Sequence, residues 1–270
     1  MDFRTIVKIA QADFAIEPFE QMLFVGSCFA DSIGKRFQEE HFRVTVNPFG
    51  VMYNPVSILH TIERVGDGQT RWRVAVLTLG TNHVYVEKAT GEVVDNCGKR
   101  PAHLFEEREL TVGECVDHLS RAIDILRERD GVEKVIVTVS PIRYAKYGFH
   151  GSQLSKAVLL LATDELAKKY PDVVTYFPAY EIVNDELRDY RFYASDMLHP
   201  SEQAVEYIWE RLSNTYFSAK TRHFIEEYRP VKAALAHRPF HPESAEYQQF
   251  MTKTQEKLDA LKKKYPEMDA

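Results

Sequence analysis

The sequence predicts an α/β protein: a three-layer α/β/α sandwich with a mostly parallel sheet, followed by a C-terminal helical tail. Short apolar runs bounded by turn formers alternate along the chain with segments of helical periodicity, as in that architecture. Residues 74–79 and 134–139 are almost continuously apolar, which is typical of strands buried on both faces. With 270 residues, of which 44% are hydrophobic, the chain can build one large core.

The individual elements follow from these patterns. We expect strands over residues 22–25, 44–46, 74–79, 134–139 and 173–177, and a small hairpin that pairs 84–86 with 91–94. Helices are expected from residue 29 onward, where Phe29, Ile33 and Phe37 recur, and over 55–62, 109–129, 154–170, 180–187 and 200–217. Pro200 suits the first turn of its helix, where the missing N–H costs nothing.

The last forty residues differ in character, so we divide the chain into a domain over 1–229 and a helical extension over 230–270. Pro230, Pro239 and Pro242 interrupt the extension, and residues 247–264 read as a charged helix with one apolar side. We expect this tail to pack on the core or on a second subunit, so that the protein is a monomer or a homodimer.

Composition excludes several classes of function. With a net charge of −6, the chain lacks the basic surface typical of a nucleic-acid binder. No window approaches the ~18 apolar residues of a membrane span.

The first residues do not resemble a signal peptide, and the three cysteines form no C-x-x-C pair, so we expect reduced thiols in the cytoplasm. An export signal already removed is the alternative. We expect no metal, because Pro239 breaks the helix that would align His237 with His241.

The segment 24–30, Phe-Val-Gly-Ser-Cys-Phe-Ala, is the first candidate for chemistry. An apolar strand ends at Gly26, Ser27 follows, and a helix begins. Free N–H groups and the macrodipole at a helix N-terminus favour developing negative charge, which suits a nucleophile. The alternative is that Ser27 only caps the helix. Cys28 points about 100° away from Ser27 around the helix, so we expect a buried structural thiol there, with a thiol nucleophile as the less favoured interpretation.

Other polar residues follow the remaining strands, where ligands bind in parallel α/β sheets. They are Asn47, Gly50 and Asn54 after the second strand, Gly80 and Asn82 after the third, and Asp196 and His199 before the helix at 200. In an Asp-x-x-His turn the carboxylate can hold one ring nitrogen while the other faces Ser27. Serine hydrolysis needs this set: a hydroxyl, an imidazole that removes its proton, a carboxylate that orients the imidazole, and oxyanion donors.

These residues, in this order, resemble the SGNH hydrolases, and more narrowly the GSCFA family, a bacterial branch of that superfamily. The resemblance rests on Gly26-Ser27-Cys28-Phe29-Ala30, on Asn47-Pro48-Phe49-Gly50 with Tyr53-Asn54-Pro55, on segments 138–143, 154–157 and 185–193, and on Asp196-x-x-His199, and it covers roughly residues 2–265. It implies a flavodoxin-like topology, Ser27 as nucleophile, His199 as base and Asp196 as its partner. The implied oxyanion donors are the N–H groups of Ser27 and Gly50 and the side-chain amide of Asn82.

The resemblance also implies an activity: a serine esterase, without a cofactor, that removes an acyl group, often acetyl, from a carbohydrate or another small ester. An acyltransferase with the same triad is one alternative. A catalytically silent SGNH scaffold that binds a glycan or a protein is another. It is favoured by Gly98 and Tyr144, which stand where the family has histidines, and by a short segment 63–73 where the family has an insertion able to form a pocket wall.

Three further residues are weaker candidates for substrate binding. Arg143 follows a strand end and can bind a substrate carboxylate or pair with an acidic residue of the protein. Tyr53 and Asn54 lie near the carboxyl edge of the predicted sheet. They can contact substrate or fix their own loop, with the structural role favoured.

Overall fold

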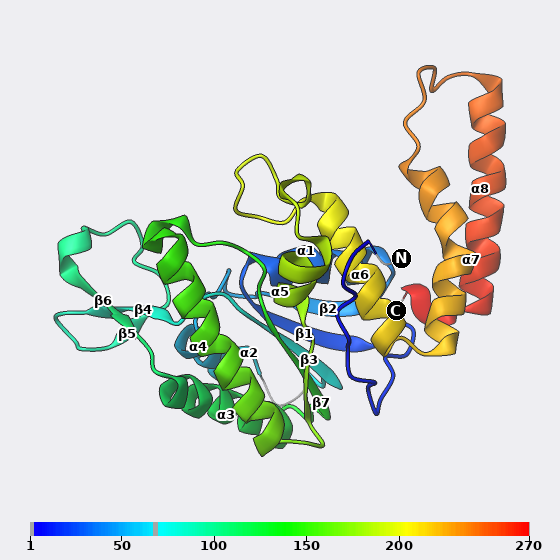
Figure 1. Cartoon of the computed structure of the whole chain (residues 1–270). Coiled ribbons are helices and arrows are strands. Elements are labelled where there is room, and N and C mark those ends of the chain that lie inside the picture. The colour runs from blue at the N-terminus through cyan, green and yellow to red at the C-terminus, as the bar shows by residue number, and fades with distance from the viewer. Residues whose placement is uncertain (1–2, 67–69, 270) are drawn as a thin grey trace.

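The computed structural model describes residues 3–66 and 70–269 and is built around a five-stranded parallel sheet (Figure 1). The strands are β1 (Gln21–Gly26), β2 (Arg43–Val46), β3 (Val74–Leu79), β7 (Lys134–Val139) and β8 (Val174–Tyr176). Their spatial order is β2-β1-β3-β7-β8, and every neighbouring pair is parallel. In chain order of these strands this is 2-1-3-4-5, the flavodoxin-like arrangement, so the predicted topology is confirmed.

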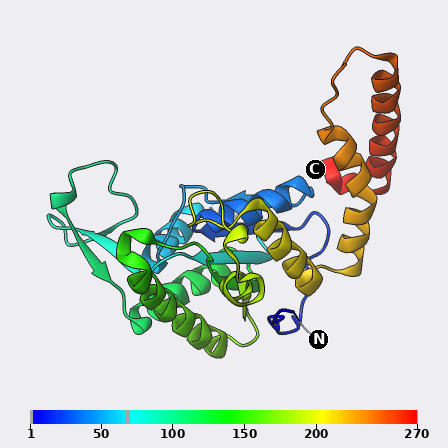
Figure 2. The same ribbon diagram turned by 45° about the horizontal axis from the view of Figure 1, so that its top comes forward.

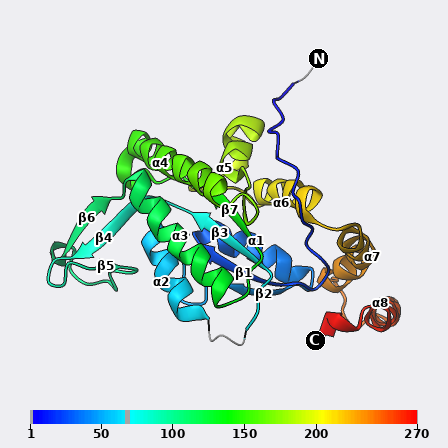
Figure 3. The same cartoon turned by 90° about the horizontal axis from the view of Figure 1, so that it is seen from below.

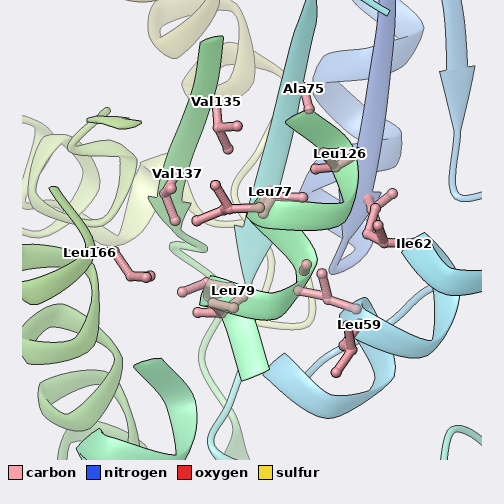
Figure 4. Close-up of a cluster of buried hydrophobic side chains, with 14 of the residues drawn as sticks. Leu59, Ile62, Ala75, Leu77, Leu79, Leu126, Val135, Val137 and Leu166 are labelled. Carbon is pink, nitrogen blue, oxygen red and sulfur yellow. The ribbon is translucent and has the colours of Figure 1, made fainter. Parts of the chain in front are cut away.

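Helices cover both faces of this sheet, as predicted (Figures 2 and 3). On one face lie α2 (Pro55–Val65), α3 (Val112–Glu128) and α4 (Gly148–Lys169), and on the other α1 (Cys28–Glu39), the short α5 (Ala179–Glu181) and α6 (Glu202–Tyr216). Alternate residues of a strand point to opposite faces. Leu23 and Val25 of β1 therefore join the first core, part of which Figure 4 shows, whereas Met22 and Phe24 join the second.

A second, antiparallel sheet extends from the end of β3. It has the order β5-β4-β6, with β4 (His83–Glu87), β5 (Val93–Val94) and β6 (Phe105–Glu109), so the predicted hairpin is present and has a third strand. The helix expected from residue 109 starts at Val112 instead. Thr111 forms a reciprocal capping box with Glu114, which sets that start and leaves Glu109 to β6.

Two other elements differ from the prediction. The helix expected at 154 begins six residues earlier, at Gly148, and the one over 180–187 consists of α5 and a π-helical turn over Ile182–Leu187. The sequence predicts no helix between residues 217 and 247, but α7 spans Ala219–Ala236 and contains Pro230. Ser218 caps α7 by accepting a hydrogen bond from the Thr221 N–H, and the apolar side of α7 is buried, which offsets the lost donor of the proline.

The C-terminal helices form an arm that extends from the body of the molecule (Figure 1). Helix α8 (Ala245–Lys264) and the 3₁₀ turn Pro266–Asp269 pack against α7. A small core of Phe19, Phe224, Tyr228, Val231 and Met268 joins the arm to the N-terminal segment. The predicted boundary between residues 229 and 230 thus falls inside α7, and the division into two domains stays a prediction. Within the described ranges, no helix is both long and apolar enough to cross a membrane.

Candidate active site

The junction between β1 and α1 is shaped by Gly26. Its φ of +145° lies in the region that favours glycine, and a Cβ placed there would lie 2.1 Å from the Thr78 carbonyl oxygen. The N–H of Gly26 donates to Asn47 Oδ1 (2.8 Å), and Asn47 Nδ2 donates to Asp31 Oδ1 of α1 (2.7 Å). Asn47 therefore ties the end of β1 to the first turn of α1. This structural role accounts for the asparagine that the sequence places directly after the second strand.

Ser27 is completely buried and caps α1. Its Oγ accepts a hydrogen bond from the Phe29 N–H (3.3 Å) and lies 3.1 Å from Thr78 Oγ1 of β3. The capping alternative weighed from the sequence is therefore the observed geometry. In this structure the Ser27 hydroxyl contacts Thr78 of β3, and its role as a nucleophile facing His199 stays a prediction.

Asp196 and His199 face each other as their spacing predicts. Asp196 Oδ2 lies 2.6 Å from His199 Nδ1, and Oδ1 accepts the backbone N–H groups of Leu198 (2.9 Å) and His199 (3.0 Å). These two N–H groups and the imidazole lower the pKa of Asp196 to about 2. At neutral pH Asp196 is thus an acceptor only, so His199 Nδ1 carries a proton and the neutral ring keeps its lone pair on Nε2.

The atom that His199 Nε2 meets is the thiol of Cys28, at 3.4 Å. Cys28 is half-buried, and this burial raises the pKa of its thiol. The sequence-based expectation of a buried structural thiol is corrected. Cys28, the residue after the N-cap, contacts His199 in this structure.

The three expected oxyanion donors are all engaged elsewhere. The Ser27 N–H donates to the Thr78 carbonyl (3.0 Å), the Gly50 N–H to the Asn47 carbonyl (2.8 Å), and Asn82 Nδ2 to the Leu110 carbonyl (2.7 Å). Asn82 is also buried, so its amide does not reach the rim.

A cavity of about 310 Å³ opens between the central sheet and the smaller sheet. Tyr53, Tyr144, Tyr147 and His83 line it, and the His83 ring stacks on Tyr147 with 3.7 Å between centroids. Burial raises the pKa of both Tyr53 and Tyr144, and a negative charge on Cys28 would raise it further. Asn54 also lines the cavity, but its side chain caps α2 by accepting the Ser57 N–H (3.0 Å).

Arg143 holds the turn that carries Asp196 and His199. Its Nη1 donates to the Met197 carbonyl (2.9 Å), and its backbone N–H donates to the Leu198 carbonyl (3.0 Å). The guanidinium also lies 4.1 Å from the ring centroid of Phe149, so a cation–π contact helps to orient it. Arg143 lines a separate cavity of about 260 Å³ as well, but its contacts with the turn indicate positioning rather than recognition of a substrate carboxylate.

Lys156 is a part of the site that the sequence-based prediction missed. Its side chain is buried, and Nζ donates to the carbonyls of Gly80 (2.6 Å) and Ser140 (2.7 Å) at the ends of β3 and β7. Burial lowers its pKa to about 7. A signal was present, because Lys156 shares the buried face of α4 with Leu159, Thr163 and Leu166, at helical spacing.

No group of three or more His, Cys, Asp and Glu side chains within residues 3–66 and 70–269 is arranged to hold a metal ion.

Two family models match the chain. The GSCFA family model matches residues 21–73 and 67–212, and the model described as "GSCFA domain protein, C-terminal domain" matches residues 229–270. No curated protein sequence matches it.

Solved structures share the fold at low identity. A catalytic mutant of Axe2, an acetylxylan esterase from Geobacillus stearothermophilus, is 12% identical, with 76% of this chain and 98% of that chain covered and a TM-score of 0.50. A GDSL-like lipase from Bacteroides thetaiotaomicron is 11% identical, with coverage of 72% and 86% and a TM-score of 0.45. At these identities the likeness concerns the fold alone.

Proposed function

This chain belongs to the GSCFA family and has the fold of the SGNH hydrolases, and from that premise we propose that it hydrolyses acyl esters through a covalent acyl-enzyme. The observation that carries the proposal is the 2.6 Å contact between Asp196 and His199 at the carboxyl edge of the sheet, with the second ring nitrogen directed at the start of α1. A carboxylate that orients an imidazole toward a nucleophile is the arrangement of covalent acyl transfer.

His199 is assigned the role of general base and then general acid. Its free Nε2 removes the proton of the nucleophile, and the resulting imidazolium gives that proton to the leaving alkoxide. Asp196 holds the ring in the required tautomer and stabilises the imidazolium. Nearly half of each side chain is exposed, so a substrate can reach the ring without rearrangement of the fold.

For the substrate we propose a small O-acyl group, such as acetyl, on a carbohydrate or another small alcohol. The cavity of about 310 Å³ between the two sheets has the size of a small-molecule site, and its tyrosine rings and polar side chains suit a hydroxyl-rich alcohol. Axe2, which shares the fold, is an acetylxylan esterase, and this agrees with the proposal.

The proposal is tested by hydrolysis of p-nitrophenyl acetate and of an acetylated xylo-oligosaccharide. We expect His199→Ala to lower kcat/KM by about 10²–10⁴-fold, the usual contribution of a general base. Asp196→Asn should cause a loss of roughly 10⁴-fold, because an amide no longer selects the tautomer with a free Nε2. The matched control is His223→Ala, since His223 is another exposed histidine paired with an acidic residue, Glu227 of α7 (3.4 Å), and this variant should keep the full rate.

Two results separate the alternatives. If an acceptor alcohol yields a new ester faster than acid is released, the same residues serve an acyltransferase. If the wild-type protein hydrolyses no ester faster than His199→Ala does, the hydrolase proposal fails, and a binding function of the scaffold takes its place.

A further inference from the structure

The two halves of the candidate active site are held by two neighbouring strands. On one side Thr78 of β3 accepts the Ser27 N–H through its carbonyl (3.0 Å), and its Oγ1 lies 3.1 Å from Ser27 Oγ. On the other side Arg143, which follows β7, holds the turn that carries Asp196 and His199. The positions of β3 and β7 therefore determine how the predicted nucleophile lies relative to the base.

Lys156 of α4 joins these two strands where their backbone pairing ends. The Ser140 N–H still donates to the Leu79 carbonyl (2.8 Å). The next bond of a parallel ladder would join the Thr81 N–H to the Ser140 carbonyl, but that N–H donates instead to a carbonyl of the loop before α2 (2.8 Å). Lys156 Nζ donates to the Ser140 carbonyl (2.7 Å) and also to the Gly80 carbonyl (2.6 Å). A side-chain amine thus continues the connection between β3 and β7.

Ser155, the preceding residue of α4, fixes the loop that follows β3. Its Oγ accepts the Asn82 N–H (3.0 Å) and lies 2.9 Å from Thr81 Oγ1. Ser155 and Lys156 are both buried, so water does not compete for these contacts. Two neighbouring residues of α4 therefore hold the carboxyl ends of β3 and β7 in place.

We propose that Lys156 is a positioning residue of the hydrolase, which acts through β3 and β7 to hold the predicted nucleophile, Ser27, in its working position relative to His199. This inference rests on the proposed function and adds a residue that touches neither the substrate nor the reacting atoms. Burial of an amine is costly unless it is hydrogen-bonded, whereas a methionine of similar length would fill the same space without that cost. The two hydrogen bonds to the strand ends, rather than the filling of space, therefore account for a lysine at this position.

Steady-state kinetics give the first test. Lys156→Met keeps the length of the side chain and removes its donors, and it should lower kcat for p-nitrophenyl acetate about 100-fold, the effect of a shift of about 1 Å between reacting groups. KM should stay within about threefold, since Lys156 does not contact the substrate. The matched control is Lys169→Met, which should keep the full rate. Lys169 ends α4, about 20 Å along the helix from Lys156, and its Nζ contacts Ser120 Oγ (2.9 Å).

Rescue by a small amine separates positioning from the mere filling of space. Lys156→Ala leaves room for ethylamine, which should restore kcat about tenfold or more, in proportion to the concentration of the neutral amine because the buried site disfavours charge. Tetramethylammonium chloride at the same ionic strength has no N–H group and should restore nothing, and Lys156→Met, which leaves no room, should not respond to ethylamine. A lost rate that ethylamine does not restore in folded Lys156→Ala would overturn the inference.

Hydrogen exchange gives a test that needs no ester and no alanine variant. In Lys156→Met, exchange should become about tenfold faster both at the Ser27 N–H, which donates to Thr78, and at the Arg143 N–H, which donates to Leu198. The control variant at the end of α4 should leave both rates unchanged. Faster exchange at only one of the two N–H groups, or at neither, would show that Lys156 does not hold the two halves together.

The outcomes separate this inference from the proposed function. If His199→Ala abolishes hydrolysis and Lys156→Met keeps the wild-type kcat, the inference is wrong while the proposed hydrolase stands. If the wild-type protein hydrolyses no ester faster than His199→Ala does, the proposed function fails, and hydrogen exchange still decides whether Lys156 holds the two strand ends.

Discussion

Lys156 is an ionisable residue whose burial disfavours its charged form. Its side chain is about 1% exposed, and its Nζ contacts two carbonyl oxygens, which match the two N–H groups of a neutral amine. These contacts hold the ends of β3 and β7 together under the catalytic rim. Lys156 thus positions the two strand ends, and its two hydrogen bonds are compatible with a neutral amine.

The lowered pKa of Lys156 predicts how the free energy of unfolding depends on pH. The folded-state pKa of Lys156 is about 7, below its ordinary value of 10.5, so between these values the unfolded chain holds one more proton than the folded chain. The free energy of unfolding should therefore rise with pH in that window, by up to about 1.4 kcal/mol per pH unit. Urea unfolding of wild type and Lys156→Met at pH 7 and 9 measures this, and a wild-type advantage that does not grow with pH would contradict it.

Ser27 and Cys28 show how a single residue step changes what a side chain contacts. Both stand at the start of the same helix, and both are polar groups able to act as nucleophiles. Because β1 pairs with β3 at Gly26 and Thr78, the N-cap side chain contacts β3 and the next side chain turns to the rim. The role of each residue depends on this pairing between segments about fifty positions apart in the chain.

At the scale of elements, the β1–α1 junction depends on a glycine. Gly26→Ala combines an unfavourable φ with a Cβ that would overlap the Thr78 carbonyl, so we expect a loss of about 3 kcal/mol or more in the free energy of unfolding. The matched control is Gly113→Ala in α3, where nothing lies within 4 Å of the added Cβ, and where alanine should instead add roughly 0.5–1 kcal/mol. Equal effects of the two variants in urea unfolding would refute this account of the junction.

The elements that the sequence-based prediction missed have local causes. Helix α7 contains Pro230, a residue that usually ends a helix, yet its buried side contacts Phe19 and Met268. Strand β6, with the sequence Phe-Glu-Glu-Arg-Glu, has no apolar alternation and is held mainly by its pairing with β4. In both elements, contacts made in the folded chain outweigh local propensity.

At the scale of the whole molecule, the helical arm and the catalytic rim lie at opposite ends of α6. His199 precedes the first turn of α6, and α7 follows its last turn, so the fifteen residues of α6 separate the two by about 22 Å. Figure 1 shows the arm extending from the body beyond α6. We therefore expect the arm to stabilise the fold without touching the chemistry.

The variant Phe224→Ala tests this separation. Phe224 is fully buried in the arm, with ring centroids 4.7 Å from Phe19 and 5.1 Å from Tyr265. Its truncation should cost about 3–5 kcal/mol of stability and speed proteolysis of the arm. The rate of ester hydrolysis measured below the unfolding transition should stay at the wild-type value, and a clear fall in kcat would show that the arm contributes to the site.

The sequence by itself determined where the five parallel strands lie along the chain, the helices that alternate with them, and the Asp196–His199 pair. These follow from hydrophobic periodicity and from a spacing of three residues in one turn, both of which are local. Only the tertiary structure decided that His199 meets Cys28 rather than Ser27, and that the amides expected at the oxyanion are already engaged. The physical reason is that those contacts join segments far apart in the chain, and that a backbone turn of about 100° at one helix start selects which side chain reaches them.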